Sequence, residues 1–212
     1  MNWSPCLPRE IEEESFRRIE AQAGGHRLAP AEWAVVRRMI HTTGDFEYLQ
    51  NVRFHPLALT NGLEALRRGR PVIADTRMLQ AGISTGRLAQ LGVEVICLMD
   101  DREVAAEAAR RGATRAAVAM ERALSKGSRG IVAIGNAPTA LLRLLDLLAA
   151  GAPPPALIVG VPVGFVNAAE SKESLTQQDC PYITSLGPKG GSGVAASIIN
   201  ALAIMALEEK TA

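Results

Sequence analysis

The sequence contains few of the features that would reveal a function directly. Aromatic residues make up 4% of the chain, the formal net charge is +1, and three cysteines occur in 212 residues. Scarce aromatic residues argue against a surface that stacks nucleic-acid bases. The balanced charge argues against a general attraction to nucleic acid or to membranes. An anionic ligand must therefore be held by local groups of Arg, Lys and backbone N–H donors.

Cysteine usage also excludes several classes of protein. Cys6, Cys97 and Cys180 are odd in number, lie far apart and form no C-x-x-C pair, so neither a disulfide framework nor a zinc site is expected. The three histidines show no metal-ligand spacing, and we expect no metal bound by protein side chains. Cys97 lies in an apolar run and is expected to be buried.

No segment has the pattern of a signal peptide or a membrane span. Residues 1–6 lack a basic region followed by an apolar one. The longest apolar stretch, residues 194–207, contains Ser197 and Asn200 and is too short to cross a bilayer. We therefore expect a buried helix there, and a cytoplasmic protein without a membrane partner.

Helical patterns fill the first third of the chain. The segment that begins at Pro8 spaces Ile11, Phe16 and Ile19 along one face and ends at Gly24-Gly25. Further helices are expected over residues 31–40 and 56–68.

Short apolar runs then alternate with helical segments. The runs are rich in β-branched residues, as is typical of parallel strands buried on both faces, and they cover residues 71–75, 93–99, 130–134, 156–161 and 182–186. Helices are expected between them over residues 76–91, 102–124 and 138–150. This alternation predicts a three-layer, doubly wound α/β fold with a mainly parallel five-stranded sheet. We expect one domain over residues 1–212, in which the N-terminal helices (about 8–69) pack on an α/β core (about 70–207).

Ligands of such sheets bind beyond the carboxyl ends of the strands, here residues 75–82, 135–139, 162–165 and 187–193. The last segment, Gly187-Pro188-Lys189-Gly190-Gly191-Ser192-Gly193, precedes a helix. Its backbone N–H groups and Lys189 suit an oxyanion, which leaves a nucleotide- or phosphosugar-binding protein as one alternative. The other interpretation, of about equal weight, is a glycine-rich turn that allows tight helix packing.

His41 is the candidate catalytic residue. It follows the helix over residues 31–40 and precedes the polar turn Thr42-Thr43-Gly44. A histidine at a helix C-terminus is stabilised in its protonated form by about 0.3–2 kcal/mol, and an imidazolium is a good general acid near neutral pH. A capping or core role is the alternative for a lone histidine. Asp45 and Glu47 are candidates to orient the ring, although an exposed turn also explains them.

Several motifs, taken together and in this order, resemble the precorrin-8X and cobalt-precorrin-8 methylmutase family of corrin biosynthesis. The resemblance extends from about Pro8 to Leu207. The motifs are Glu14-Ser15-Phe16, Arg38-Met39-Ile40-His41, the segment 135–141, the segment 164–172, and Lys189-Gly190-Gly191-Ser192. The resemblance implies a flavodoxin-like fold and a homodimer with active sites at the subunit interface.

The resemblance also implies a reaction and a site. A methyl group migrates from C11 to C12 of the ring, giving hydrogenobyrinic acid or cobyrinic acid, without a cofactor, and cobalt, where present, belongs to the substrate. His41 matches the catalytic acid. The implied substrate-binding residues are Ser15, Arg38, Met78, Thr114, Arg115, Gly164, Phe165, Lys189, Gly190 and Gly191. A non-catalytic tetrapyrrole carrier is a further alternative, which turnover would exclude.

Overall fold

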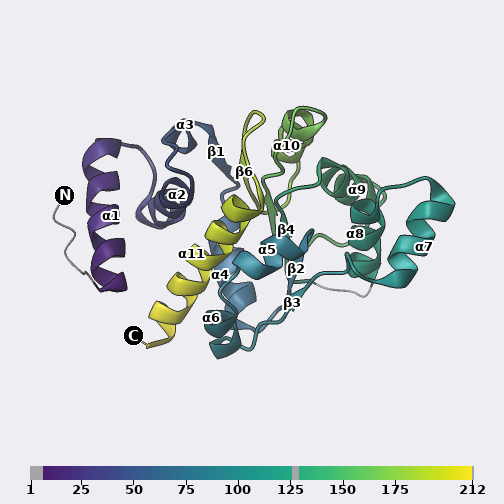
Figure 1. Ribbon diagram of the computed structural model, residues 1–212, viewed down its shortest axis with the longest axis horizontal. Coiled ribbons are helices and arrows are strands. Elements are labelled where there is room, and N and C mark those ends of the chain that lie inside the picture. The colour runs from purple at the N-terminus through teal and green to yellow at the C-terminus, as the bar shows by residue number, and fades with distance from the viewer. Residues whose placement is uncertain (1–6, 126–128, 212) are drawn as a thin grey trace.

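A computed structural model describes residues 7–125 and 129–211, in which helices enclose a single sheet (Figure 1). The sheet has six strands in the spatial order β1-β6-β5-β4-β2-β3. The strand bounds are β1 Val52–Phe54, β2 Val72–Ala74, β3 Val95–Ile96, β4 Ile131–Ile134, β5 Leu157–Gly160 and β6 Tyr182–Ser185.

All five predicted strands are present and parallel to one another, and the prediction of a mainly parallel sheet is confirmed. The predicted number of strands was wrong by one. β1 pairs antiparallel with the edge strand β6, with Val52 opposite Ser185. At three residues, β1 is too short to show an apolar alternation in the sequence. If the five parallel strands β2 to β6 are renumbered 1 to 5 along the chain, their spatial order, starting from β3, is 2-1-3-4-5. The chain connections therefore diverge between β2 and β4.

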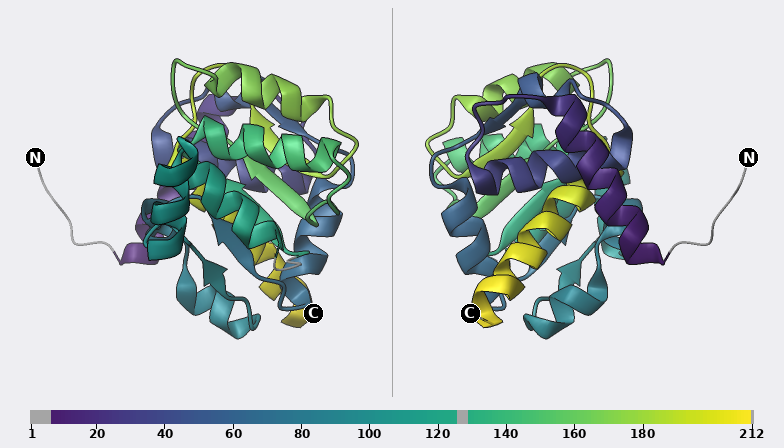
Figure 2. Two further views of the ribbon diagram at one scale, coloured as in Figure 1. Left: turned by 90° about the vertical axis from the view of Figure 1, so that its right-hand side faces the viewer. Right: turned by 90° about the vertical axis from the view of Figure 1, so that its left-hand side faces the viewer.

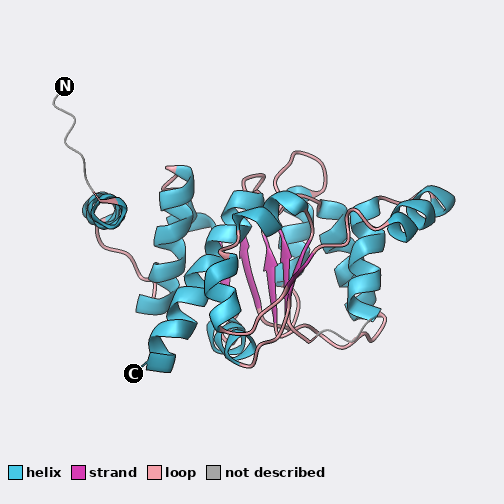
Figure 3. Cartoon of the chain, turned by 60° about the horizontal axis from the view of Figure 1, so that its bottom comes forward, coloured by secondary structure: helices cyan, strands magenta, loops and turns pink. Residues whose placement is uncertain are grey.

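Helices cover both faces of the sheet (Figure 3). Their bounds are α1 Pro8–Ala23, α2 Pro30–Thr43, α3 Tyr48–Asn51, α4 Ala58–Arg67, α5 Arg77–Gly82, α6 Thr85–Gln90, α7 Arg102–Arg111, α8 Arg115–Ser125, α9 Pro138–Ala149, α10 Ala168–Thr176 and α11 Ser192–Thr211. Alternate strand residues face opposite layers: Ile131 packs with α2, α4 and α11, whereas Val132 packs with α8, α9 and α10. Both faces are buried, as the apolar runs predicted.

Two predicted helices are each divided in the structure. Residues 76–91 form α5 and α6, separated at Ile83, whose extended backbone ends α5. Residues 102–124 form α7 and α8, because Gly112 ends α7 in the left-handed conformation that glycine adopts readily (φ 62°). The buried helix expected at residues 194–207 is present within α11. Cys97 is only partly buried, because it follows the edge strand β3.

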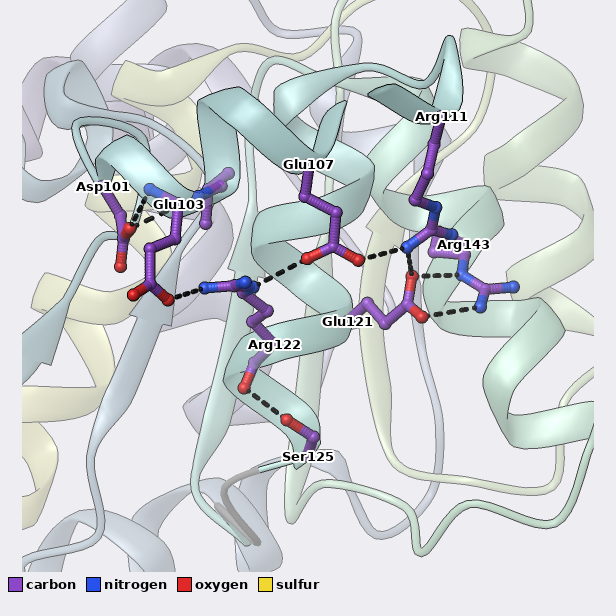
Figure 4. Close-up of polar contacts among 9 residues, drawn as sticks. Asp101, Glu103, Glu107, Arg111, Glu121, Arg122, Ser125 and Arg143 are labelled. Atoms are coloured by element: carbon purple, nitrogen blue, oxygen red, sulfur yellow. Dashed lines mark hydrogen bonds and ion pairs between the residues drawn. The ribbon is translucent and has the colours of Figure 1, made fainter. Parts of the chain in front are cut away.

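The helices α1 and α7 lie at opposite ends of the molecule (Figure 1). α1 lies outside α2, away from the sheet (Figure 2). α7 packs on α8 through a small apolar cluster and through ion pairs that join Glu107 to Arg111 and Arg122 (Figure 4). Glu121 extends these ion pairs to Arg143 of α9.

None of the helices within residues 7–125 and 129–211 has the length and apolar character needed to cross a membrane. The prediction about residues 1–6, and Cys6 with it, lies outside the described residues.

Candidate functional site

An open hollow lies at the carboxyl ends of β2 and β4, where the connections of the sheet diverge. It encloses about 720 Å³ and is lined by Thr76, Arg77, Met78, Met99, Asp100, Arg115, Asn136 and Ser192. The hydroxyls of Thr76 and Ser192 are 3.0 Å apart, which joins the end of β2 to the start of α11. Arg77 is paired with Asp100 at 2.6 Å. Arg115 forms no ion pair with another described residue, so its guanidinium is free to meet a ligand carboxylate.

Asp75 fixes the turn that forms one wall of this hollow. Its carboxylate is 4% exposed and accepts hydrogen bonds from the backbone N–H groups of Gly135 (3.1 Å), Asn136 (2.8 Å) and Ala137 (2.9 Å). Burial raises the pKa of the Asp75 carboxyl, and the three N–H donors oppose that shift. These backbone donors are therefore occupied by Asp75 and are not available to a substrate anion.

The glycine-rich loop packs tightly against neighbouring backbone. A Cβ at Gly190 would lie 2.1 Å from the carbonyl oxygen of Val161, and one at Gly135 would lie 2.7 Å from the Cα of Ser192. The Gly191 N–H donates to the Val161 carbonyl at 2.9 Å. The packing interpretation of this loop is confirmed. The Gly191 N–H is therefore used within the protein and is not available to a ligand anion.

His41 lies in a second hollow, between α1 and α2. This hollow encloses about 580 Å³ and is lined by Ser15, Arg18, Ile19, Gln22, Ile40, His41, Gly44 and Phe46. His41 is in the last turn of α2, which continues to Thr43 rather than ending at Ile40 as predicted. Gly44 closes the helix in the left-handed conformation (φ 67°), and its N–H donates to the Ile40 carbonyl. The His41 side chain is exposed.

The α1 helix contributes an aromatic ring that contacts His41. The Phe16 ring meets the His41 ring edge to face, with centroids 5.1 Å apart, and the guanidinium of Arg37 lies 4.4 Å from the same Phe16 centroid. Arg38, predicted to bind substrate, is paired with Glu12 of α1 at 3.1 Å. Ion pairs and one ring therefore hold α1 beside His41.

The turn after His41 is joined to the glycine-rich loop. Lys189 Nζ lies 2.6 Å from Asp45 Oδ2 and 3.0 Å from Glu47 Oε2. The bond from Lys189 lowers the pKa of the Asp45 carboxyl, and the two carboxylates raise the pKa of the Lys189 ammonium. Asp45 and Glu47 thus bind Lys189, and neither forms a hydrogen bond to His41 within the described chain.

The predicted site residues fall into three groups. Ser15 shares its hollow with His41, while Met78 and Arg115 share the hollow at the strand ends. Thr114 is next to the latter and bonds Thr139 at 2.9 Å. Gly164 and the 96%-exposed Phe165 lie in the loop after β5. Leu79, the neighbour of Met78 in the chain, is fully buried in the core and does not line either hollow.

The start of α11 lies between the hollow at the strand ends and the turn after His41. Ser192 lines one of them, and its neighbour Gly193 approaches Thr42, which follows His41. The sequence analysis included Asp75, Asn136 and Ser192 in the segments expected to bind ligands but gave none of them an individual role. An Asp directly after a buried strand, facing a Gly-Asn turn after a second strand, is the signal that was available.

No three His, Cys, Asp or Glu side chains come together as a metal site would require, as far as the described residues extend.

Comparison with known proteins gives a consistent result. A sequence model of the family described as "Precorrin-8X methylmutase" matches residues 10–205. The chain is 43% identical to the cobalt-precorrin-8 methylmutase of Priestia megaterium, with 94% of this chain and 88% of that protein covered. It is 42% identical to the precorrin-8X methylmutase of Pseudomonas aeruginosa, with coverages of 91% and 93%.

The fold also matches a solved structure. A crystal structure of precorrin-8X methylmutase from Thermus thermophilus superposes with a TM-score of 0.88 at 43% sequence identity, covering 95% of this chain and 99% of that one.

Proposed function

The chain belongs to the precorrin-8X methylmutase family, and we propose that His41 is the general acid of its methyl migration. The enzyme is an isomerase of corrin biosynthesis: the bond from the methyl carbon to C11 breaks and a bond to C12 forms within one molecule. Atoms balance without a methyl donor, and cobalt, where present, enters as part of the substrate. The chemical requirement is to hold a polycarboxylate ring and to place one proton.

The position of His41 carries this proposal. Its exposed ring is in the last turn of α2, where it lines the hollow between α1 and α2. Phe16 contacts the His41 ring, and His41 also lines the hollow. An imidazole nitrogen of His41 can thus present a proton to a ligand in the hollow. Its transfer to a ring nitrogen or carbon favours migration, and a proton returns to His41 once the bond to C12 has formed, because the reaction is an isomerisation.

The two hollows together form the proposed substrate site. Arg115 and Lys189 supply positive charge for the carboxylates of the ring, and Met78 and Phe165 supply apolar surface. Lys189 shares its charge with two carboxylates, so Arg115 is the stronger candidate for a bidentate contact. Ser15 and Arg38 complete the side that is next to His41.

A homodimer with interface active sites accounts for three exposed apolar side chains that follow β2 and β5. Met78, Phe165 and Val166 are 74%, 96% and 77% exposed. Apolar surface of this kind beside a site is typical of a subunit interface. Light scattering of Phe165→Ser should give a lower mass than wild type, and an unchanged dimer would remove this loop from the interface.

We also assign the sheet to the flavodoxin-like class. The parallel strands follow the order 2-1-3-4-5 of that class, and the proposed site lies at its switch point between β2 and β4.

The proposed function is tested by an absorbance time course with precorrin-8X in large excess over protein. Wild type should convert the excess substrate. His41→Ala should keep its fold and convert the substrate about 10²–10⁴-fold more slowly. His26→Ala is the matched control, because His26 is also exposed and stacks on Trp33 outside both hollows. A His41→Ala variant at the wild-type rate would refute the assignment. A stoichiometric spectral change without turnover would indicate a carrier, unless the cobalt-containing substrate is converted.

A further inference from the structure

Lys172, in α10, is a buried cation without an anionic partner. Its side chain is 0% exposed, and its Nζ donates to the backbone carbonyl of Lys189 at 2.6 Å. No ion pair to Lys172 occurs in the described part of the chain. The sequence analysis included this residue in a family motif but gave it no role.

Such a residue is costly to keep. Burial lowers the pKa of the Lys172 ammonium to about 8, because the charged form loses its hydration and gains no opposite charge. An uncharged side chain of similar length would fill the same space without that penalty. A cost of this kind beside a candidate site indicates that the residue serves activity rather than stability.

The carbonyl that Lys172 holds belongs to the residue that contacts the His41 turn. The Lys189 carbonyl also accepts a hydrogen bond from Ser185 Oγ at 3.2 Å. The side chain of Lys189 runs the other way, to Asp45 at 2.6 Å. The Asp45 N–H donates to Thr43 Oγ1, whose hydroxyl donates to the Met39 carbonyl inside α2.

These contacts form a continuous connection from α10 to the last turn of α2. We propose that Lys172 is a positioning residue: it fixes the Lys189 backbone, and through the Lys189–Asp45 pair it sets the position of the turn that carries His41. The inference rests on the proposed role of His41. It makes the orientation of the acid depend on a buried residue in another layer of the fold.

The test compares three variants in turnover and in urea unfolding. Lys172→Met should lower kcat about tenfold, within the hundredfold that a displacement of about 1 Å causes, with KM changed less than about twofold. Its urea midpoint should equal or exceed that of wild type. Ser171→Ala is the matched control, because Ser171 is also fully buried in α10 but bonds only the Ala168 carbonyl of its own helix. That control should leave kcat unchanged.

A double-mutant cycle with Asp45→Asn distinguishes the positioning role of Lys172 from a merely structural one. If Lys172 acts through Asp45, then Lys172→Met should cost less than about twofold in kcat in the Asp45→Asn background. If the losses of kcat caused by Lys172→Met and Asp45→Asn multiplied in the double variant, the proposal would be overturned. An unchanged kcat in Lys172→Met would also overturn it, as would a loss of stability in Lys172→Met that parallels its loss of activity. If Lys172→Met does not fold, Ser185→Ala can be used instead, because it removes the other hydrogen-bond donor to the Lys189 carbonyl. This variant should lower kcat a few-fold, and an unchanged kcat would overturn the proposal.

A readout without substrate separates this inference from the proposed function. In ¹³C-histidine-labelled protein, Lys172→Met should shift the His41 signal, assigned by its loss in His41→Ala, whereas Ser171→Ala should not. If wild type showed no turnover while this shift occurred, the proposed function would fail and the positioning role would stand. An unmoved His41 signal would overturn the positioning role alone.

Discussion

The hollow beside His41 and the hollow at the ends of β2 and β4 are held together in different ways. On the His41 side, α1 has no buried residue among its described side chains and is attached through Phe16 and through ion pairs such as Arg38–Glu12. At the strand ends, the walls are backbone segments that nearly touch, and Asp75 is buried beneath them.

The energetic consequence of this difference is large. Exposed ion pairs contribute about 0–1 kcal/mol each, so the His41 side can rearrange at little cost. Backbone segments in close contact have no such freedom, because an added methyl group must displace main chain. We therefore expect substitutions on the His41 side to change activity more than stability, and substitutions at the strand ends to change stability first.

The largest effect should come from Gly190→Ala. Its Cβ would lie 2.1 Å from the Val161 carbonyl oxygen and 3.0 Å from that of Pro162, so the loop must move, at a cost of about 3 kcal/mol. Urea unfolding measures this loss. Gly86→Ala is the control, because no atom lies within 4 Å of its Cβ and alanine favours the helix by up to about 1 kcal/mol. Equal stability of the two variants would contradict the comparison.

The pH dependence of stability should reveal the buried Lys172. Its pKa is about 8 in the folded protein against about 10.4 in the unfolded chain. The burial penalty is therefore complete below pH 8 and disappears as the pH rises towards about 10.4. Over this interval the free energy of unfolding of wild type should gain about 3 kcal/mol from Lys172. The stability of Lys172→Met minus that of wild type should fall over this interval, as measured by urea unfolding. A constant difference would show that the ammonium is not desolvated.

Asp75→Asn should lower the free energy of unfolding by about 2 kcal/mol. The amide places an NH₂ group where the carboxylate accepts N–H donors from Gly135, Asn136 and Ala137, and each unpaired buried donor costs about 1–3 kcal/mol. Asp101→Asn provides the control at the half-buried N-cap of α7, where Asn and Asp are nearly equivalent. Thermal unfolding of both variants measures the difference. Equal melting temperatures would show that Asp75 does not stabilise the turn over residues 135–137.

Phe16→Ala should have the smallest effect on stability and a clear effect on activity. The partly exposed ring contacts His41 and Arg37, so we expect a loss of about 1 kcal/mol and a fall in kcat of about tenfold. Ile11→Ala on the same helix removes a side chain that is 56% exposed and should change neither quantity. Steady-state kinetics and urea unfolding decide. A Phe16→Ala variant that lost stability but kept its kcat would reverse the expected behaviour of the His41 side.

Local pattern was sufficient for the framework of this protein. The five parallel strands were predicted because burial on both faces requires continuous apolar residues, which a sequence displays directly. His41 was placed at a helix end because Gly44 follows it, and the family motifs made it the candidate acid. These properties depend on residues that are neighbours in the chain, so they can be read without coordinates.

The contacts that organise the site were decided by tertiary structure. Asp75 bonds a turn about 60 residues further along the chain, and Lys189 meets Asp45 across 144 positions. A carboxylate or an ammonium looks the same in the sequence whether it meets solvent, a substrate or a backbone group. Its partner depends on which strand ends the topology brings together. Sequence alone therefore predicted most of the elements and the candidate acid, while the fold determined which backbone groups Asp75, Lys172 and the glycines contact.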